Sequence, residues 1–259
     1  MSYDADTIIR TRHLAKSFPL YADQREWLKQ ALFGNFKTFS KSFWALRDID
    51  FEVRRGDSVG ILGRNGCGKT TLLQIICGMT RATRGEVWVK GRVAPVLALG
   101  ATFDQESTGR QNVLIAGAVM GLKRSEVMAK FDSIAEFAGI GAFMNQPLKH
   151  YSTGMRTRLA FAICAHVEAD ILIVDEALSV GDVAFQRKCL DWIDSFKKTG
   201  TLLFVSHAMD QVRRLCDRTV WIDKGRIREQ GDPHQVIRAY LQAIRSERDD
   251  VRRFSSSEQ

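Results

Sequence analysis

The stretch from Gly63 to Thr71 constrains this chain more than any other part of its sequence. It reads GRNGCGKTT and fits a known pattern: a glycine, four residues, then Gly-Lys and Ser or Thr. Glycines let the backbone N–H groups turn toward a chain of phosphates, Lys69 adds a positive charge, and the Thr70 hydroxyl can ligate Mg²⁺. The predicted nucleotide-binding residues of this loop are Gly63, Arg64, Asn65, Gly66, Cys67, Gly68, Lys69, Thr70 and Thr71.

The residues on either side of this loop support the prediction. Ser58–Leu62 is a short apolar run typical of a buried strand, and Thr71–Ile76 has the pattern of a helix start. A helix N-terminus favours anions, so a strand, a glycine loop and a helix in this order are the context that the pattern requires.

Two carboxylates follow a second apolar run. Ile171–Val174 is predicted to be a buried strand, and Asp175 and Glu176 come directly after it. Ligands of α/β sheets bind at the carboxyl ends of the strands. We therefore expect Asp175 to join Thr70 as a magnesium ligand, and Glu176 to orient or deprotonate a water that attacks the γ-phosphate.

A histidine follows a third apolar run. His207 comes after the predicted strand Leu202–Val205 and Ser206. At the ligand edge of the sheet its imidazole could donate a hydrogen bond to the γ-phosphate. A single histidine is more often structural, so this assignment depends on the other motifs.

The turn Tyr151–Arg156 precedes a predicted helix over 154–167. Ser152 or Thr153 can cap this helix, and its free N–H groups would make a second anion site. Two phosphate sites far apart in one chain indicate that two copies share a nucleotide. An ordinary helix cap is the alternative interpretation.

The order of these motifs resembles the ATP-binding subunit of an ABC transporter, over roughly residues 7 to 245. The resemblance implies an α/β fold: a P-loop NTPase with a RecA-like, largely parallel sheet, an inserted helical subdomain and an antiparallel β part. Strands alternating with helices along the sequence independently predict a parallel sheet covered by helices. The expected domain is 1–245, with a helical subdomain at about 100–165 and a charged, disordered tail over 246–259.

The resemblance also implies roles and partners. ATP and Mg²⁺ would be the cofactors, with Glu176 and His207 catalytic and Thr70 and Asp175 on the metal. A second copy of the chain would complete each site in trans, and hydrolysis would drive a membrane permease. The residues of this trans-acting signature are Ser152, Thr153, Gly154 and Met155.

Three segments of the chain depart from the common pattern of the family and narrow the resemblance to one subfamily. These are the signature at 151–162, the segment Asp175–Asp182, and Leu97–Phe103 in the region of the usual glutamine loop. They resemble ATPase subunits that export capsular polysaccharide, O-antigen or teichoic acid chains on lipid carriers. A lipid-linked glycan or polyol phosphate is therefore the expected transported substrate. Gln105 lies beyond the place of the usual glutamine, whose role stays unassigned.

An inserted segment at 19–44 separates two predicted strands. Its spacing predicts an amphipathic helix after Asp23, either touching lipid or the permease or packed on its own domain. Adenine usually stacks on an aromatic ring in the family. Phe18 stands where that ring belongs, and Phe43 and Trp44 are alternatives because the insertion blurs the alignment.

The charge and the ends of the chain suggest where it acts. The net charge of +8 suits nucleic acid, an anionic membrane surface or simply a solvated basic face. The sequence has no aromatic–glycine RNA-binding motif and no zinc-finger spacing, so no nucleic-acid partner is expected. The N-terminus lacks a signal-peptide core. Together with the resemblance, this places the chain at the cytoplasmic face of the membrane, bound to its permease. The alternatives are an ABC ATPase of another export system and a soluble ABC ATPase that does not take part in transport.

Overall fold

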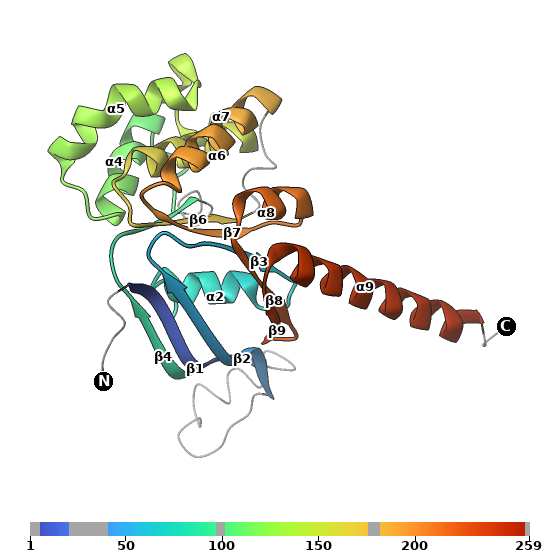
Figure 1. The fold of residues 1–259 in the computed structure, drawn as a ribbon. Coiled ribbons are helices and arrows are strands. Elements are labelled where there is room, and N and C mark those ends of the chain that lie inside the picture. Colours follow the sequence, from blue (N-terminus) through green and yellow to red (C-terminus); the bar gives the residue numbers. More distant parts are fainter. Residues whose placement is uncertain (1–5, 21–40, 97–101, 176–181, 257–259) are drawn as a thin grey trace.

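The computed structural model describes residues 6–20, 41–96, 102–175 and 182–256. Within these ranges a six-stranded sheet, sheet B, lies between two apolar cores (Figure 1). Its first five strands pair in parallel, and its last strand pairs antiparallel to its neighbour. In spatial order the strands are β5 (Val93–Pro95), β6 (Ile171–Asp175), β7 (Thr201–Val205), β3 (Ser58–Leu62), β8 (Arg218–Asp223) and β9 (Arg226–Gly231).

Strands β6 and β7 are buried on both faces, which explains their continuous apolar sequences. Successive side chains of a strand point to opposite faces. Leu172 and Val174 of β6 accordingly lie in one core, whereas Ile171 and Ile173 lie in the other. A solvent-exposed face would have required polar residues at every second position.

The smaller sheet, sheet A, is antiparallel and has the order β2-β1-β4 in the described residues. Its strands are β1 (Thr7–Leu20), β2 (Lys41–Arg54) and β4 (Arg84–Val89). Strands β1 and β2 are longer than the sequence indicates, because cross-strand pairs such as Phe18 with Phe43 continue the ladder to Leu20 and Lys41. Residues 19–20 and 41–44 are therefore strand rather than part of the inserted segment. The predicted amphipathic helix lies outside the described residues.

The helices divide between the two cores. The phosphate-loop helix α2 (Lys69–Ile76) packs with sheet A on one face of sheet B, and helices α4 to α8 pack on the other (Figure 1). The helices of that second layer are α4 (Gly109–Val119), α5 (Arg124–Ala138), α6 (Thr153–His166), α7 (Val183–Phe196) and α8 (Met209–Leu215), with short 3₁₀ turns at Gly141–Asn145 and Leu148–His150. The predicted fold class, an α/β protein with a parallel sheet, a helical part and an antiparallel part, is confirmed.

The last helix, α9, spans Pro233–Ser256 and extends away from the body (Figure 1). Asp232 caps it, because its carboxylate accepts hydrogen bonds from the His234 and Gln235 N–H groups, at 2.9 and 3.1 Å. Helix α9 continues to Ser256 and so extends into the segment from residue 246 for which the sequence predicts disorder.

We predict that Tyr240→Ala lowers the free energy of unfolding by about 3 kcal/mol. Tyr240 is buried and meets the Trp221 ring edge-on with centroids 5.5 Å apart, so its loss leaves a cavity between α9 and β8. Chemical denaturation followed by circular dichroism measures the change. The neighbouring Leu241 is 36% exposed, and Leu241→Ala should cost less than about 1 kcal/mol. Equal costs for the two variants would contradict the packing described.

Candidate nucleotide-binding site

Three neighbouring strands of sheet B end at one edge, and each carries one of the predicted motifs. Strand β7 lies between β6 and β3, with Val205 paired to both Asp175 and Ile61. The phosphate loop follows β3, Asp175 ends β6, and Ser206 and His207 follow β7. The parallel topology therefore brings together motifs that are far apart in the sequence.

The phosphate loop is shaped by glycines with positive φ. Gly66 and Gly68 have φ values of 77° and 112°, in the region that side chains avoid. Lys69 is buried, and its Nζ donates to the carbonyl oxygens of Gly63 and Arg64 at 2.8 and 3.1 Å. The lysine charge is thus held inside the curve of the loop, where a phosphate would lie.

Helix α2 begins without a side-chain cap. Its N-cap residue, Gly68, cannot supply one, so the first N–H groups of the helix are available to a ligand. Together with the helix dipole and the Lys69 charge, these groups form a site for a phosphate chain. Thr70, in the first turn, is exposed, and Thr71 is half-buried.

His207 is held at the phosphate loop. Its Nε2 lies 3.1 Å from the Asn65 side-chain oxygen. An amide oxygen only accepts hydrogen bonds, so this contact favours the tautomer that carries the proton on Nε2. The sequence analysis placed both residues in the site but did not foresee that they touch, since 142 positions separate them.

The acidic end of β6 is partly described. Asp175 is buried at the end of β6, at the same edge of sheet B where β3 leads into the phosphate loop. Carboxylate and hydroxyl oxygens suit a hard cation, so the residue types of Asp175 and Thr70 fit Mg²⁺. Glu176, the expected base, lies outside the described residues, as does the segment from 97 to 101 in the glutamine-loop region.

The predicted signature turn stands at the start of α6. Ser152 caps the helix as predicted, its hydroxyl accepting from the Met155 N–H at 3.1 Å. Ser152 and Thr153 are exposed, and Gly154 and Met155 are half-buried. Thr153 is not among the described residues with positive φ, so its side chain causes no backbone strain.

An ion pair that the sequence analysis missed joins α6 to α7. Arg158 forms it with Asp182, which also caps α7 by accepting from the Phe185 N–H at 2.8 Å. Arg158 further lies over the Phe185 ring, 4.9 Å from its centroid. The position of Asp182 just before a helical pattern was a usable sign of its capping role. The ion pair between Arg158 and Asp182 could not be predicted from the sequence, because it depends on how the two helices pack.

Cys67 is a small buried thiol in the phosphate loop. Burial raises the pKa of its thiol, although the Lys69 charge opposes this shift. The thiol therefore stays protonated and neutral at physiological pH. Its sulfur fills the space beside Gly63, where a Cβ could not fit.

Three aromatic rings stand near the site. Phe18 is 37% exposed with the Lys16 ammonium 5.0 Å from its ring centroid, and Phe43, its cross-strand partner, is also exposed. The Arg84 guanidinium stacks on Trp44 at 5.3 Å. A cation therefore covers one face of Trp44 and one face of Phe18, so these contacts do not decide which ring stacks on adenine, and Phe18 stays the prediction.

The sequence profile of the ABC transporter family matches residues 46–179, which include the phosphate loop, the signature turn and the end of β6. The chain belongs to this family. It is an ABC ATPase, the type of subunit that binds and hydrolyses ATP. The placement of the motifs in the structure agrees with that assignment.

Relatives resemble this ABC ATPase over most of its length. The O-antigen export system ATP-binding protein RfbB of Klebsiella pneumoniae is 41% identical over 92% of this chain and 98% of its own. The teichoic acids export ATP-binding protein TagH of Listeria monocytogenes is 42% identical over 90% of this chain and 70% of its own.

A solved structure shares the fold. The ATP-binding cassette MJ0796, solved as a dimer in a post-hydrolysis state with ADP and Pi, superposes with a TM-score of 0.71. It covers 87% of this chain and 99% of its own, at 16% identity. Among the described residues of this ABC ATPase, no helix combines the length and apolar character that crossing a membrane requires.

We predict that Gly68→Ala weakens MgATP binding by at least about a hundredfold. The added Cβ would lie 2.5 Å from the Ala45 carbonyl oxygen, at a φ that alanine avoids, so the loop amides would move. Gly78→Ala is the matched control: its φ is +71° but its Cβ meets nothing within 4 Å. It should reduce stability while leaving affinity intact. Titration with a fluorescent ATP analogue measures both variants, and unchanged affinity in Gly68→Ala would refute the assigned loop geometry.

Proposed function

We propose that this ABC ATPase powers the export of a lipid-linked polysaccharide or polyol phosphate across the cytoplasmic membrane. The observation that carries this proposal is the 41% identity to an O-antigen export subunit over 92% of the chain. The likeness to a teichoic acid export subunit points to the same class of cargo, a long polymer rather than a small solute. The partner would be an integral-membrane permease, which would hold the chain at the cytoplasmic face of the membrane.

In the proposed mechanism the phosphate loop holds the outer phosphates of ATP. Lys69 would exchange its bonds to loop carbonyls for phosphate oxygens, and the free N–H groups of α2 would contribute further contacts. Thr70 and Asp175 are the residues that would hold Mg²⁺, which supplies positive charge against the phosphates. Phe18 is the proposed stacking partner of adenine.

Hydrolysis needs a group that activates water and a group that detects the terminal phosphate. Glu176 is proposed as the first and His207 as the second. The contact of His207 with Asn65 supports this role, because it keeps a donating Nε2 beside the loop until a phosphate oxygen can accept instead. Replacement of the Asn65 oxygen by a phosphate oxygen as the acceptor would couple nucleotide binding to a movement of the carboxyl end of β7.

The proposed ATP site is completed by a second copy of the chain. The phosphate loop and the signature turn belong to helices in opposite layers of one copy, α2 on one face of sheet B and α6 on the other. The exposed N-terminus of α6, with Ser152, Thr153, Gly154 and Met155, is free to meet a nucleotide held by another molecule. The dimeric state of the structural neighbour supports this arrangement.

We predict that Glu176→Gln lowers phosphate release by about a hundredfold or more, the usual contribution of a general base. ATP binding should remain, so ATP-bound dimers should accumulate on size-exclusion chromatography. Lys69→Ala is the control that should neither bind ATP nor dimerise. In cells, the Glu176→Gln subunit should leave the polymer on the cytoplasmic side.

Two results would count against this account separately. Hydrolysis by Glu176→Gln at the wild-type rate would show that another base operates. If Glu176→Gln abolishes ATP hydrolysis but cells still display normal surface polymer, the export role would be refuted, whereas the assignment as an ATPase would stand.

A further inference from the structure

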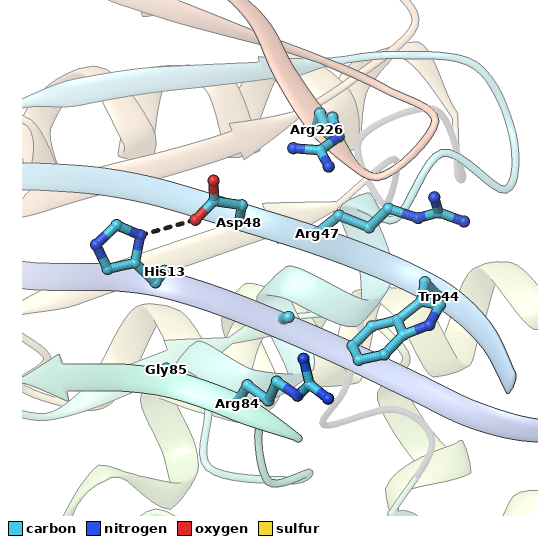
Figure 2. Close-up of a pocket in the computed structure, with 8 residues that line it drawn as sticks. His13, Trp44, Arg47, Asp48, Arg84, Gly85 and Arg226 are labelled. Carbon is cyan, nitrogen blue, oxygen red and sulfur yellow. Dashed lines mark hydrogen bonds and ion pairs between the residues drawn. The ribbon is translucent and has the colours of Figure 1, made fainter.

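A basic pocket of about 430 Å³ lies on the exposed side of sheet A, between its strands and the start of β9 (Figure 2). Three arginines from three different strands line it: Arg47 on β2, Arg84 on β4 and Arg226 on β9. Trp44 lies beneath Arg84, which covers its ring at 5.3 Å. The pocket is separate from the motifs that explain ATP hydrolysis.

Within the described residues, the pocket arginines Arg47, Arg84 and Arg226 form no ion pair. Other arginines of the same described part, such as Arg158 and Arg214, are paired with carboxylates. Like charges gathered around one hollow repel each other, and an anion in the hollow would relieve that repulsion. The arrangement therefore favours a negatively charged ligand.

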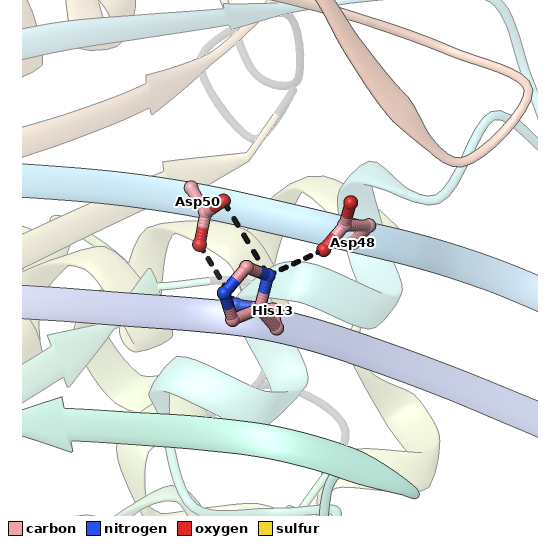
Figure 3. Close-up of side chains that lie close together, drawn as sticks. All are labelled: His13, Asp48 and Asp50. Carbon is pink, nitrogen blue, oxygen red and sulfur yellow. Dashed lines mark hydrogen bonds and ion pairs between the residues drawn. The ribbon is translucent and has the colours of Figure 1, made fainter.

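The carboxylate of the pocket is already engaged. Asp48 lies 2.8 Å from His13 Nδ1, and Asp50 accepts from the His13 backbone N–H at 2.7 Å (Figure 3). The hydrogen bond to Asp48 raises the pKa of His13, and the same contact engages one Asp48 oxygen with the imidazole rather than with the arginines. His13, Asp48 and Asp50 are also close enough to share a cation, but the neighbouring guanidinium groups disfavour one.

The lining identifies a class of ligand. Guanidinium groups match phosphate oxygens in pairs, and several of them suit a group with several negative charges. The volume lies within the range of small-ligand pockets. We propose that this pocket binds a diphosphate group, held by Arg47 and Arg226, with the rest of the ligand against Trp44 and Arg84. The proposal does not depend on the export function.

The pocket borders the ATP site without being part of it. The Arg47 N–H donates to the Gly225 carbonyl at 2.7 Å, and the Gly225 N–H donates to the Cys67 carbonyl at 3.0 Å. The pocket wall is thus joined to the phosphate loop by backbone hydrogen bonds through one glycine. Binding must therefore be measured with the ATP site filled, so that the two sites are not confused.

Calorimetric titration of pyrophosphate into the MgADP-saturated protein tests the proposal. The double variant Arg47→Gln and Arg226→Gln should weaken binding at least about a hundredfold, since each charge-assisted contact contributes about tenfold or more. The control is Arg213→Gln with Arg214→Gln, which removes the same charge from α8, where the arginines pair with Asp210 and Asp194. It should bind pyrophosphate as the wild type does.

The proposal is overturned if the ADP-saturated wild type shows no saturable pyrophosphate binding, or if both double variants weaken it equally. Competition between pyrophosphate and ADP for one site would also overturn it, because the pocket would then belong to the ATP site. Unchanged ADP affinity and unfolding temperature in the pocket variant show that it is folded.

A second arm identifies the source of the diphosphate. Phosphatidylcholine vesicles containing farnesyl diphosphate are sedimented with each variant. Retention of the wild type, and its loss in the pocket variant, would support the proposal with a lipid-borne ligand. Pyrophosphate binding without retention would support it with a soluble ligand.

Discussion

Gly68 stands at the start of α2 with a left-handed backbone and no side chain, so the first N–H groups of the helix have no cap. Those groups, and the Lys69 charge folded against its own loop, favour an anion at this point. Neighbouring elements hold the loop in this shape. The Ala45 carbonyl of β2 leaves no room for a side chain at Gly68, and Gly225 between β8 and β9 bonds to the loop backbone. Both sheets thus support one uncapped helix end.

Much of the fold and of the site could be predicted because local sequence carries the needed information. The strands β3, β6 and β7 are largely apolar since both their faces are buried, and their polar residues stand at their ends: Ser58, Asp175 and Thr201. The strand lengths of sheet A could not be predicted, because the pairing of Phe18 with Phe43 spans an insertion. The contact of His207 with Asn65 depends on β7 lying beside β3, which no local pattern states.

The division of the helices between two layers has a functional consequence. Helix α2 packs in one core and α6 in the other, so the two helix N-termini that can bind phosphate are not neighbours in one copy. The two helix N-termini differ in the groups that they present. The phosphate loop before α2 carries the buried Lys69 charge, whereas the signature turn at α6 presents an exposed cap and amides. In the proposed arrangement, a nucleotide shared between two copies would use both ends, and ATP would then control how tightly the copies associate.

A mixing experiment tests this sharing most directly. One copy carries Lys69→Ala and a differently tagged copy carries Gly154→Asp, and each should fail to pair with itself because both of its sites are damaged. Mixed with ATP and no Mg²⁺, so that nothing is hydrolysed, the two should pair, because one intact loop then meets one intact signature. Pull-down through one tag should recover the other copy only when ATP is present. Recovery no greater than for either variant alone would contradict the account.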